Sequence, residues 1–190
     1  MKELRMTLLV FLFSLAGGIA HAQYAPGQYA DIVELYESGT DGGSIPGGVT
    51  GTYRRNLTIA LDDNLGITLD TATGRILLPG GVYRIEASAP ANVLGGHRTG
   101  VIVFYADTSA GIRYQWWGTS GANYDPSQAA IVWMNPRSWV TVPKVCLETP
   151  TWIEIRQYAE ATVVASTNLG KATNDGWDEI YTTVKIQRLY

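Results

Sequence analysis

Residues able to do acid–base or nucleophilic chemistry are sparse in this sequence. Histidine occurs twice, and beyond residue 22 only His97 remains, in the segment GGHRTG. A Ser-His-Asp or Cys-His site would have to be built around that one imidazole. Neither a G-x-S-x-G elbow nor an H-E-x-x-H motif occurs. We therefore interpret His97 and Arg98 as polar residues at a strand entrance, and expect a protein without catalytic residues or cofactors.

Two acidic, glycine-containing segments are the candidates for a metal site. Residues 39–43 read GTDGG and residues 174–179 read NDGWDE, and their oxygen atoms could bind Ca²⁺. Neither segment has the EF-hand spacing, so ordinary Asx turns explain them better and we expect no metal. The single cysteine, Cys146, excludes an intrachain disulfide. Because it lies between Val145 and Leu147, we expect it to be buried.

Aromatic residues supply the most suggestive recognition chemistry. Trp and Tyr together number 17, and several lie in the second half of the chain beside Gly, Asn or Asp. Adjacent Trp116 and Trp117 must point to opposite faces if they lie on one strand, so one of them is exposed or lies in a subunit interface. Exposed rings of this kind stack on sugars and anchor protein interfaces. The candidate ligand-binding residues, on or near the glycine-rich loop 118–125, are Trp117, Tyr124 and Asp125.

The elements that must position these residues are strands. In VYRIEASA, the side chains of Tyr83, Ile85, Ala87 and Ala89 share one face, which indicates a strand with one side in the core. Many similar short segments follow, separated by Gly, Asn, Pro and Ser, and no amphipathic helix of useful length follows residue 30. Residues 52–63 resemble one more strand. We predict an all-β protein, an antiparallel β-sandwich or jelly roll, whose last strand lies in the middle of a sheet.

The N-terminus differs from the rest of the chain. Lys2 and Arg5 precede a mostly apolar stretch, and Ala20-His21-Ala22 fits a signal-peptidase site. Residues 1–22 are therefore interpreted as a signal peptide, or alternatively as a retained hydrophobic arm. Residues 23–38 form a linker and first strand, and residues 39–190 form the folded domain. With a net charge of −3 and no basic cluster along the chain, nucleic acid is not an expected partner.

Four segments resemble a known family. LPGGVYRIEASAPA, GGHRTGVIVF, TPTWIEIRQYAEA and NDGWDEIYTTVKIQRL are similar to strands of C1q/TNF-like jelly rolls, which occur in phage tail-fibre and related virion proteins and in bacterial or prophage-encoded proteins. The likeness covers roughly residues 39–189. It implies a ten-stranded jelly roll that assembles as a homotrimer with its loops on a distal face. A secretion signal departs from the pattern of a phage fibre, which is assembled in the cytoplasm.

These observations support three hypotheses about function. The first is a non-enzymatic trimeric module of a virion or bacterial surface that binds a receptor or glycan through its loops, with Trp152 and Tyr181 pointing outward in the trimer interface. The second is a capsid or tail decoration protein held to other virion proteins by the N-terminal arm. The third is a secreted carbohydrate-active enzyme, for which two carboxylates would suffice. A cleaved signal implies a secreted or surface location, whereas a retained N-terminus implies the virion.

Overall fold

Strands make up almost all of the regular structure. The computed structural model describes residues 27–42, 50–91, 96–105, 108–119, 121–122, 137–159, 169–170, 172 and 175–190. Residues 1–22, predicted as a signal peptide or arm, lie outside that part. The elements are β1 Tyr29–Tyr36, β2 Gly51–Arg54, β3 Ile59–Asp63, β4 Thr68–Asp70, β5 Arg75–Leu78, β6 Gly81–Pro90, β7 Gly96–Phe104, the 3₁₀ turn η1 Thr108–Ala110, β8 Ile112–Trp117, β9 Gly121–Ala122, β10 Arg137–Leu147, β11 Thr151–Ala159 and β12 Glu179–Arg188.

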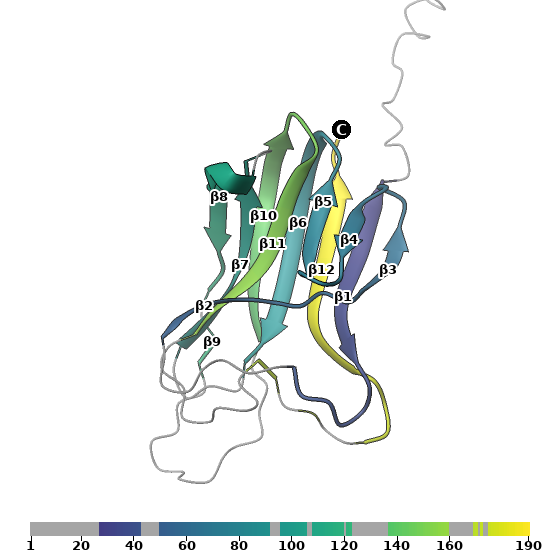
Figure 1. The fold of residues 1–190 in the computed structure, drawn as a ribbon, viewed down its shortest axis with the longest axis vertical. Helices are drawn as coiled ribbons and strands as arrows, with labels where there is room; N and C mark the ends of the chain where they lie inside the picture. Colours follow the sequence, from purple (N-terminus) through teal and green to yellow (C-terminus); the bar gives the residue numbers. More distant parts are fainter. Residues whose placement is uncertain are drawn as a thin grey trace, which may run out of the picture.

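The strands form two antiparallel sheets that face each other (Figure 1). One sheet has five strands in the order β10-β6-β12-β1-β3. The other has seven, in the order β4-β5-β11-β7-β8, with β2 also pairing with β11 and β9 with β7. The last strand, β12, lies between β6 and β1, as predicted. No helix in the described ranges is long and apolar enough to cross a membrane.

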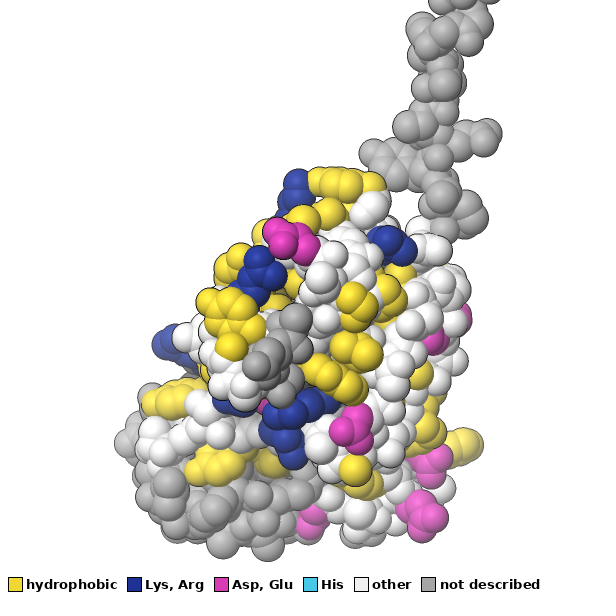
Figure 2. Space-filling model, turned by 45° about the horizontal axis from the view of Figure 1, so that its top comes forward, with side chains coloured by type: hydrophobic (Ala, Val, Ile, Leu, Met, Phe, Trp, Pro, Cys, Tyr) yellow, Lys and Arg dark blue, Asp and Glu magenta, His cyan; other side chains and the backbone are white. Residues whose placement is uncertain are grey.

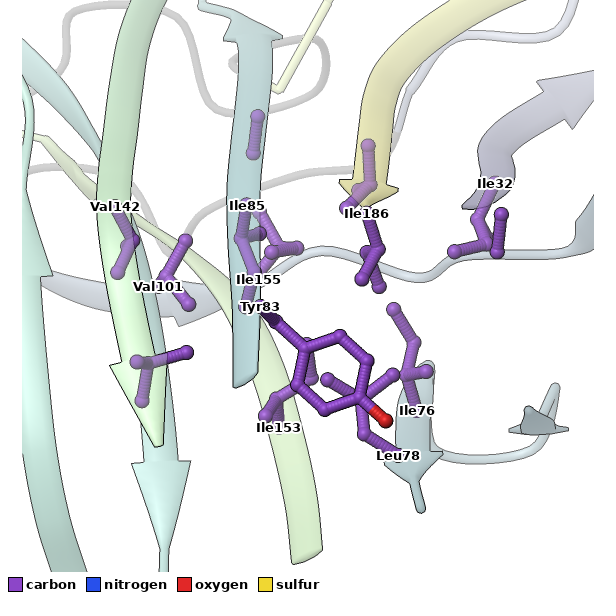
Figure 3. Close-up of a cluster of buried hydrophobic side chains, with 14 of the residues drawn as sticks. Ile32, Ile76, Leu78, Tyr83, Ile85, Val101, Val142, Ile153, Ile155 and Ile186 are labelled. Carbon is purple, nitrogen blue, oxygen red and sulfur yellow. The ribbon is translucent and has the colours of Figure 1, made fainter. Parts of the chain in front are cut away.

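An apolar core fills the space between the sheets. The alternation read from the sequence of β6 is confirmed, because Tyr83, Ile85, Ala87 and Ala89 are all at most 3% exposed. Figure 3 shows Tyr83 and Ile85 meeting Ile153 and Ile155, which come from β11 of the opposite sheet. Each such side chain stabilises the fold by about 1.5–3 kcal/mol through its burial. The core thereby fixes which side of every strand faces outward.

The segment 52–63 forms two strands in different sheets, not the single strand predicted. β2 pairs with β11 of the seven-stranded sheet, and β3 pairs with β1 of the five-stranded sheet. The crossing is anchored at both ends, because the amide of Arg55 donates to Ile155 O at 2.8 Å and that of Thr58 to Val33 O at 3.0 Å. Arg55 itself is fully buried between the layers. A pattern of alternation cannot reveal such a change of sheet.

Two side chains point the opposite way from expectation. Tyr181 is only 2% exposed, while its neighbour Ile180 is 48% exposed. The pairing of β12 with β1 contains a bulge, since Val33 is opposite Thr183 but Leu35 is opposite Ile180. This extra residue reverses the alternation and turns Tyr181 inward. Cys146 is exposed, not buried, because its neighbours Val145 and Leu147 fill the core.

Candidate binding surface

The outer face of the seven-stranded sheet carries a group of arginines and aromatic residues. Ile153 and Ile155 of β11 point into the core, as do Val101 and Val103 of β7, so the alternating residues of both strands point outward. The strand pairing then places the outward residues in rows across the sheet. We call the following residues the arginine face: Arg54, Arg75, Arg98, Arg156, Trp117, Trp152 and Tyr158.

A single buried carboxylate holds three of these arginines. Glu154 is 1% exposed. Its two oxygens accept from Arg75 Nε at 2.8 Å and from Arg156 Nε at 2.7 Å, and Arg54 Nη1 lies 3.6 Å away. Burial alone would raise the pKa of Glu154, but the hydrogen bonds and charges of Arg75 and Arg156 together lower it. The carboxylate is therefore ionised at neutral pH and fixes the guanidinium groups in place.

The aromatic ring of Phe104 packs beneath the guanidinium groups of Arg75 and Arg156, on the side of the sheet. The Cζ atoms of Arg75 and Arg156 lie 5.2 Å and 5.8 Å from the centroid of the Phe104 ring. Phe104 is itself only 6% exposed, although it points outward. Cation–π contact and the ion pairs therefore restrain these arginines together. The face is rigid compared with an array of free surface arginines.

Trp117 lies flat against the sheet because its cross-strand partner is a glycine. Gly100 faces Trp117 in the pairing of β7 with β8. A Cβ atom on Gly100 would lie 2.6 Å from Trp117 Cε3, which is closer than van der Waals contact permits. Trp116 points the other way and packs against the main core, so the prediction of opposite faces for the pair is confirmed. The indole of Trp117 is half-buried and available on its outer side.

The remaining predicted site residues are distributed differently. Tyr124 and Asp125 lie outside the described residues. Trp152, proposed for an interface, lies on the arginine face, where it is opposite Leu77 in the pairing of β11 with β5. Tyr181 is inside the protomer, and its hydroxyl donates to Thr40 O at 2.7 Å. The segments considered for Ca²⁺ include Asp175, whose Oδ1 accepts from the Trp177 amide as in an Asx turn. No metal-binding group of three His, Cys, Asp or Glu occurs among the described residues.

A second polar cluster is buried between the sheets. Arg55 Nε donates to Glu34 Oε2 and to Thr182 Oγ1, both at 2.8 Å, and Nη1 donates to Gln157 Oε1 at 2.9 Å. Gln157 Nε2 in turn lies 3.2 Å from His97 Nδ1. His97 does stand near the start of β7, as predicted, but it is fully buried. Burial, with the charge of Arg55, lowers its pKa to about 4, so the imidazole is neutral at neutral pH.

The outer side of the five-stranded sheet holds a hollow of about 510 Å³. Its charged lining is balanced, with Asp31 and Glu86 against Arg84 and Lys185. Arg84 Nη2 and Glu86 Oε1 form an ion pair within it at 2.5 Å. The hollow therefore presents no excess of either charge, in contrast to the arginine face.

The sequence alone did not predict the arginine face. Its arginines come from four strands and are separated by up to 102 positions, so no basic cluster appears along the chain. The one local signal is the segment EIR at 154–156, whose alternation places Glu154 and Arg156 on the same side. Only the strand pairing reveals that Arg54 and Arg75 join them.

Comparison with solved structures settles the type of sandwich. The structure of Eiger TNF from S. frugiperda aligns over 87% of this chain and 94% of its own, with a TM-score of 0.50 and 12% identity. The fold is a TNF-like jelly roll. Murine APRIL aligns over 86% of this chain and 99% of its own, with a TM-score of 0.48 and 8% identity. No family model and no curated protein matches the TNF-like chain by sequence.

Proposed function

We propose that the protein is a non-enzymatic, homotrimeric binding module of a virion or bacterial surface, and that it contacts a receptor or glycan. The observation that carries the assembly is the position of the exposed apolar side chains. Five of the ten large hydrophobic side chains that are exposed among the described residues lie on two edges of the sandwich, where a monomer would leave them in water. Figure 2 shows hydrophobic side chains among charged ones on the surface of the described part.

The first apolar edge is formed by β8 and β10, which end their sheets on the same side (Figure 1). Its exposed side chains include Trp139 at 60%, Ile112 at 42% and Tyr114 at 42%. The second edge is β3, at the far end of the five-stranded sheet. Leu61 there is 60% exposed and Ile59 is 40% exposed. The two edges differ in sequence and shape.

Two different apolar edges on one protomer favour a ring. A twofold interface uses the same patch on both subunits, whereas contact between two different patches generates a closed ring when the rotation closes. A trimer would cover both edges of each protomer at once. It would also present three copies of the outer faces, so that weak single contacts add by avidity.

A binding role fits the chemistry of the described residues better than catalysis does. His97 is fully buried between the sheets and is neutral at neutral pH. Glu154 has its oxygens engaged by arginines, which suits a structural anion better than a proton donor. The arginine face, by contrast, offers fixed donors and a flat ring to a ligand.

Measurement of mass in solution tests the assembly. Light scattering on the purified chain should give three times the protomer mass, and Leu61→Asp should shift the protein to monomer with its far-UV circular dichroism unchanged. Trp177→Ser is the matched control, because Trp177 is 77% exposed but lies on neither edge. A monomeric wild-type protein, or a trimer that Leu61→Asp leaves intact, would contradict the proposed arrangement.

A further inference from the structure

The accessible charge on the arginine face is positive, although the chain as a whole carries −3. Four arginines face two carboxylates there, those of Glu154 and Asp70. Glu154 is buried beneath its arginines. Asp70, opposite Arg75 on β4, accepts from the amide of Ala72 at 3.0 Å and from the Thr73 hydroxyl. Solvent on this side therefore meets the guanidinium groups and the half-exposed Asp70, but not the buried Glu154.

The guanidinium groups of Arg75 and Arg156 have N–H donors that remain available to a ligand. Arg75 and Arg156 each use Nε to bond Glu154. Within the described part of the chain, no hydrogen bond engages their terminal nitrogens. A guanidinium that is held through Nε presents its remaining N–H groups as a fork, and this geometry matches a carboxylate. The orientation is set before any ligand arrives, which reduces the entropy lost on binding.

Trp117 extends the same row of residues. Across the sheet, Arg54 is opposite Arg156, Arg156 is opposite Gly100, and Gly100 is opposite Trp117. Four neighbouring strands span about 14 Å at the usual strand spacing. The guanidinium groups of Arg54 and Arg156 at one end and a flat indole at the other suit a chain of rings that carry carboxylates. A sugar ring can lie on the indole while a carboxylate on the chain meets the guanidinium groups.

Other anionic partners fit this face less well. A lipid bilayer would require apolar side chains that project from the face and insert beside the cations, but Ile102 and Phe104 are only 1% and 6% exposed and Trp117 is half-buried against the sheet. A nucleic acid brings a dense phosphate backbone toward a chain of net negative charge. A carboxylated polysaccharide has a lower charge density and offers ring faces for stacking.

We infer that the arginine face binds an acidic polysaccharide, with sugar carboxylates on Arg54 and Arg156 and a sugar ring on Trp117. This inference rests on the proposed binding function and names its ligand class. It assigns ligand contact to a sheet face instead of the distal loops. Arg54 and Arg156 belong to β2 and β11, which lie outside the two apolar edges.

Calorimetric titration of the purified full chain with an oligogalacturonate hexamer tests the inference. The matched ligand is the same hexamer with its carboxylates reduced to alcohols. Arg54→Gln should weaken binding of the acidic hexamer at least about tenfold, because a charge-assisted hydrogen bond is lost. Trp117→Ala should weaken it by about fivefold or more through loss of stacking. Arg84→Gln, the same charge change on the other sheet, should leave the affinity within about twofold.

Each result bears on the inference in a defined way. Tight binding of the acidic hexamer that both variants weaken supports it. Absence of binding overturns it, as does binding that Arg54→Gln and Trp117→Ala leave unchanged. Equal binding of the reduced hexamer overturns the anionic ligand class while the proposed binding function stands. Preference for anionic vesicles or for single-stranded RNA, abolished by the same variants, overturns the polysaccharide. The proposed trimer is tested separately by its mass.

Discussion

The guanidinium of Arg55 lies 2.6 Å from the carboxylate of Glu34, and neither side chain is more than 1% exposed. This ion pair connects the segment that crosses between the sheets to β1. Thr182 and Gln157 add hydrogen bonds to the pair from β12 and β11. Both sheets therefore share one buried polar cluster near the centre of the sandwich, and its energetics can be measured.

Glu34→Gln should lower the free energy of unfolding by about 3–5 kcal/mol, because it leaves the Arg55 charge buried without its counterion. Urea denaturation at a fixed protein concentration measures this change. The double variant Glu34→Leu with Arg55→Met should recover part of the loss, since no charge then remains inside. Arg84→Gln removes an exposed ion pair and should cost less than about 1 kcal/mol. A loss of less than about 1 kcal/mol for Glu34→Gln would contradict a tightly coupled buried pair.

His97 should make stability depend on pH in the acidic range. Its pKa is lowered to about 4 by burial and by the Arg55 charge, against 6.5 in an unfolded chain. Below pH 6.5 the unfolded chain takes up a proton that the folded protein excludes, so stability falls as the pH drops toward 4. The full loss is about 3 kcal/mol. The difference in unfolding free energy between wild type and His97→Asn should change across this window and stay constant above pH 7.

Glu154 should also make the protein less stable as the pH falls. Because its pKa is lowered in the fold, its contribution is present at neutral pH and is lost as the pH falls through the folded-state value. Glu154→Gln should therefore be clearly less stable than wild type at pH 7 and approach it at strongly acidic pH. The variant also leaves three arginines close together without their counterion. Because salt screens the repulsion between them, added salt should reduce the loss of stability. Equal stability of the two proteins at pH 7 in low salt would contradict the anchoring role.

Gly100→Ala should displace Trp117 from the sheet. The new methyl group would overlap the indole, and we expect a loss of about 1–3 kcal/mol together with a changed near-UV circular dichroism spectrum. Gly27→Ala is a suitable control, because its Cβ would meet only the flexible Gln187 side chain at 3.3 Å. A near-UV spectrum unchanged by Gly100→Ala would show that the indole does not lie on this glycine.

Cys146 should react in the folded protein. Its exposure predicts rapid modification by a chromogenic aromatic disulfide, at a rate within about tenfold of that of the unfolded chain. Absorbance of the released thiolate measures the rate, and far-UV circular dichroism checks that the fold persists. Labelling only at the rate of global unfolding would contradict the position of Cys146 on the outer side of β10.

Alternation in the sequence predicted an antiparallel sandwich and several of its strands. Tyr83, Ile85, Ala87 and Ala89 of β6 are buried as predicted, although Ser88 and Pro90 at the end of the strand are buried as well. The same rule was wrong for Tyr181 because of a bulge in the pairing of β12 with β1. It also merged β2 with β3, since Arg55 is a charged residue that the interior accepts only because Glu34 is beside it.

The binding surface was less accessible to prediction than the fold. The position of Trp117 beside Gly100 depends on the register of β7 with β8, which no local pattern specifies. The gathering of Arg54, Arg75 and Arg156 around Glu154 depends on the pairing of both β2 and β5 with β11. Long-range pairing of this kind is a property of the topology, and one sequence contains no direct record of it.

The position of β12 between β6 and β1 also constrains when the chain can fold during its synthesis. Until residue 188 has left the ribosome, β1 and β6 have no common neighbour, and the five-stranded layer remains in two pieces. The hydrophobic faces of the other strands of this sheet therefore stay exposed to solvent until β12 has been synthesised. Chaperones that hold such intermediates would be expected to govern its yield.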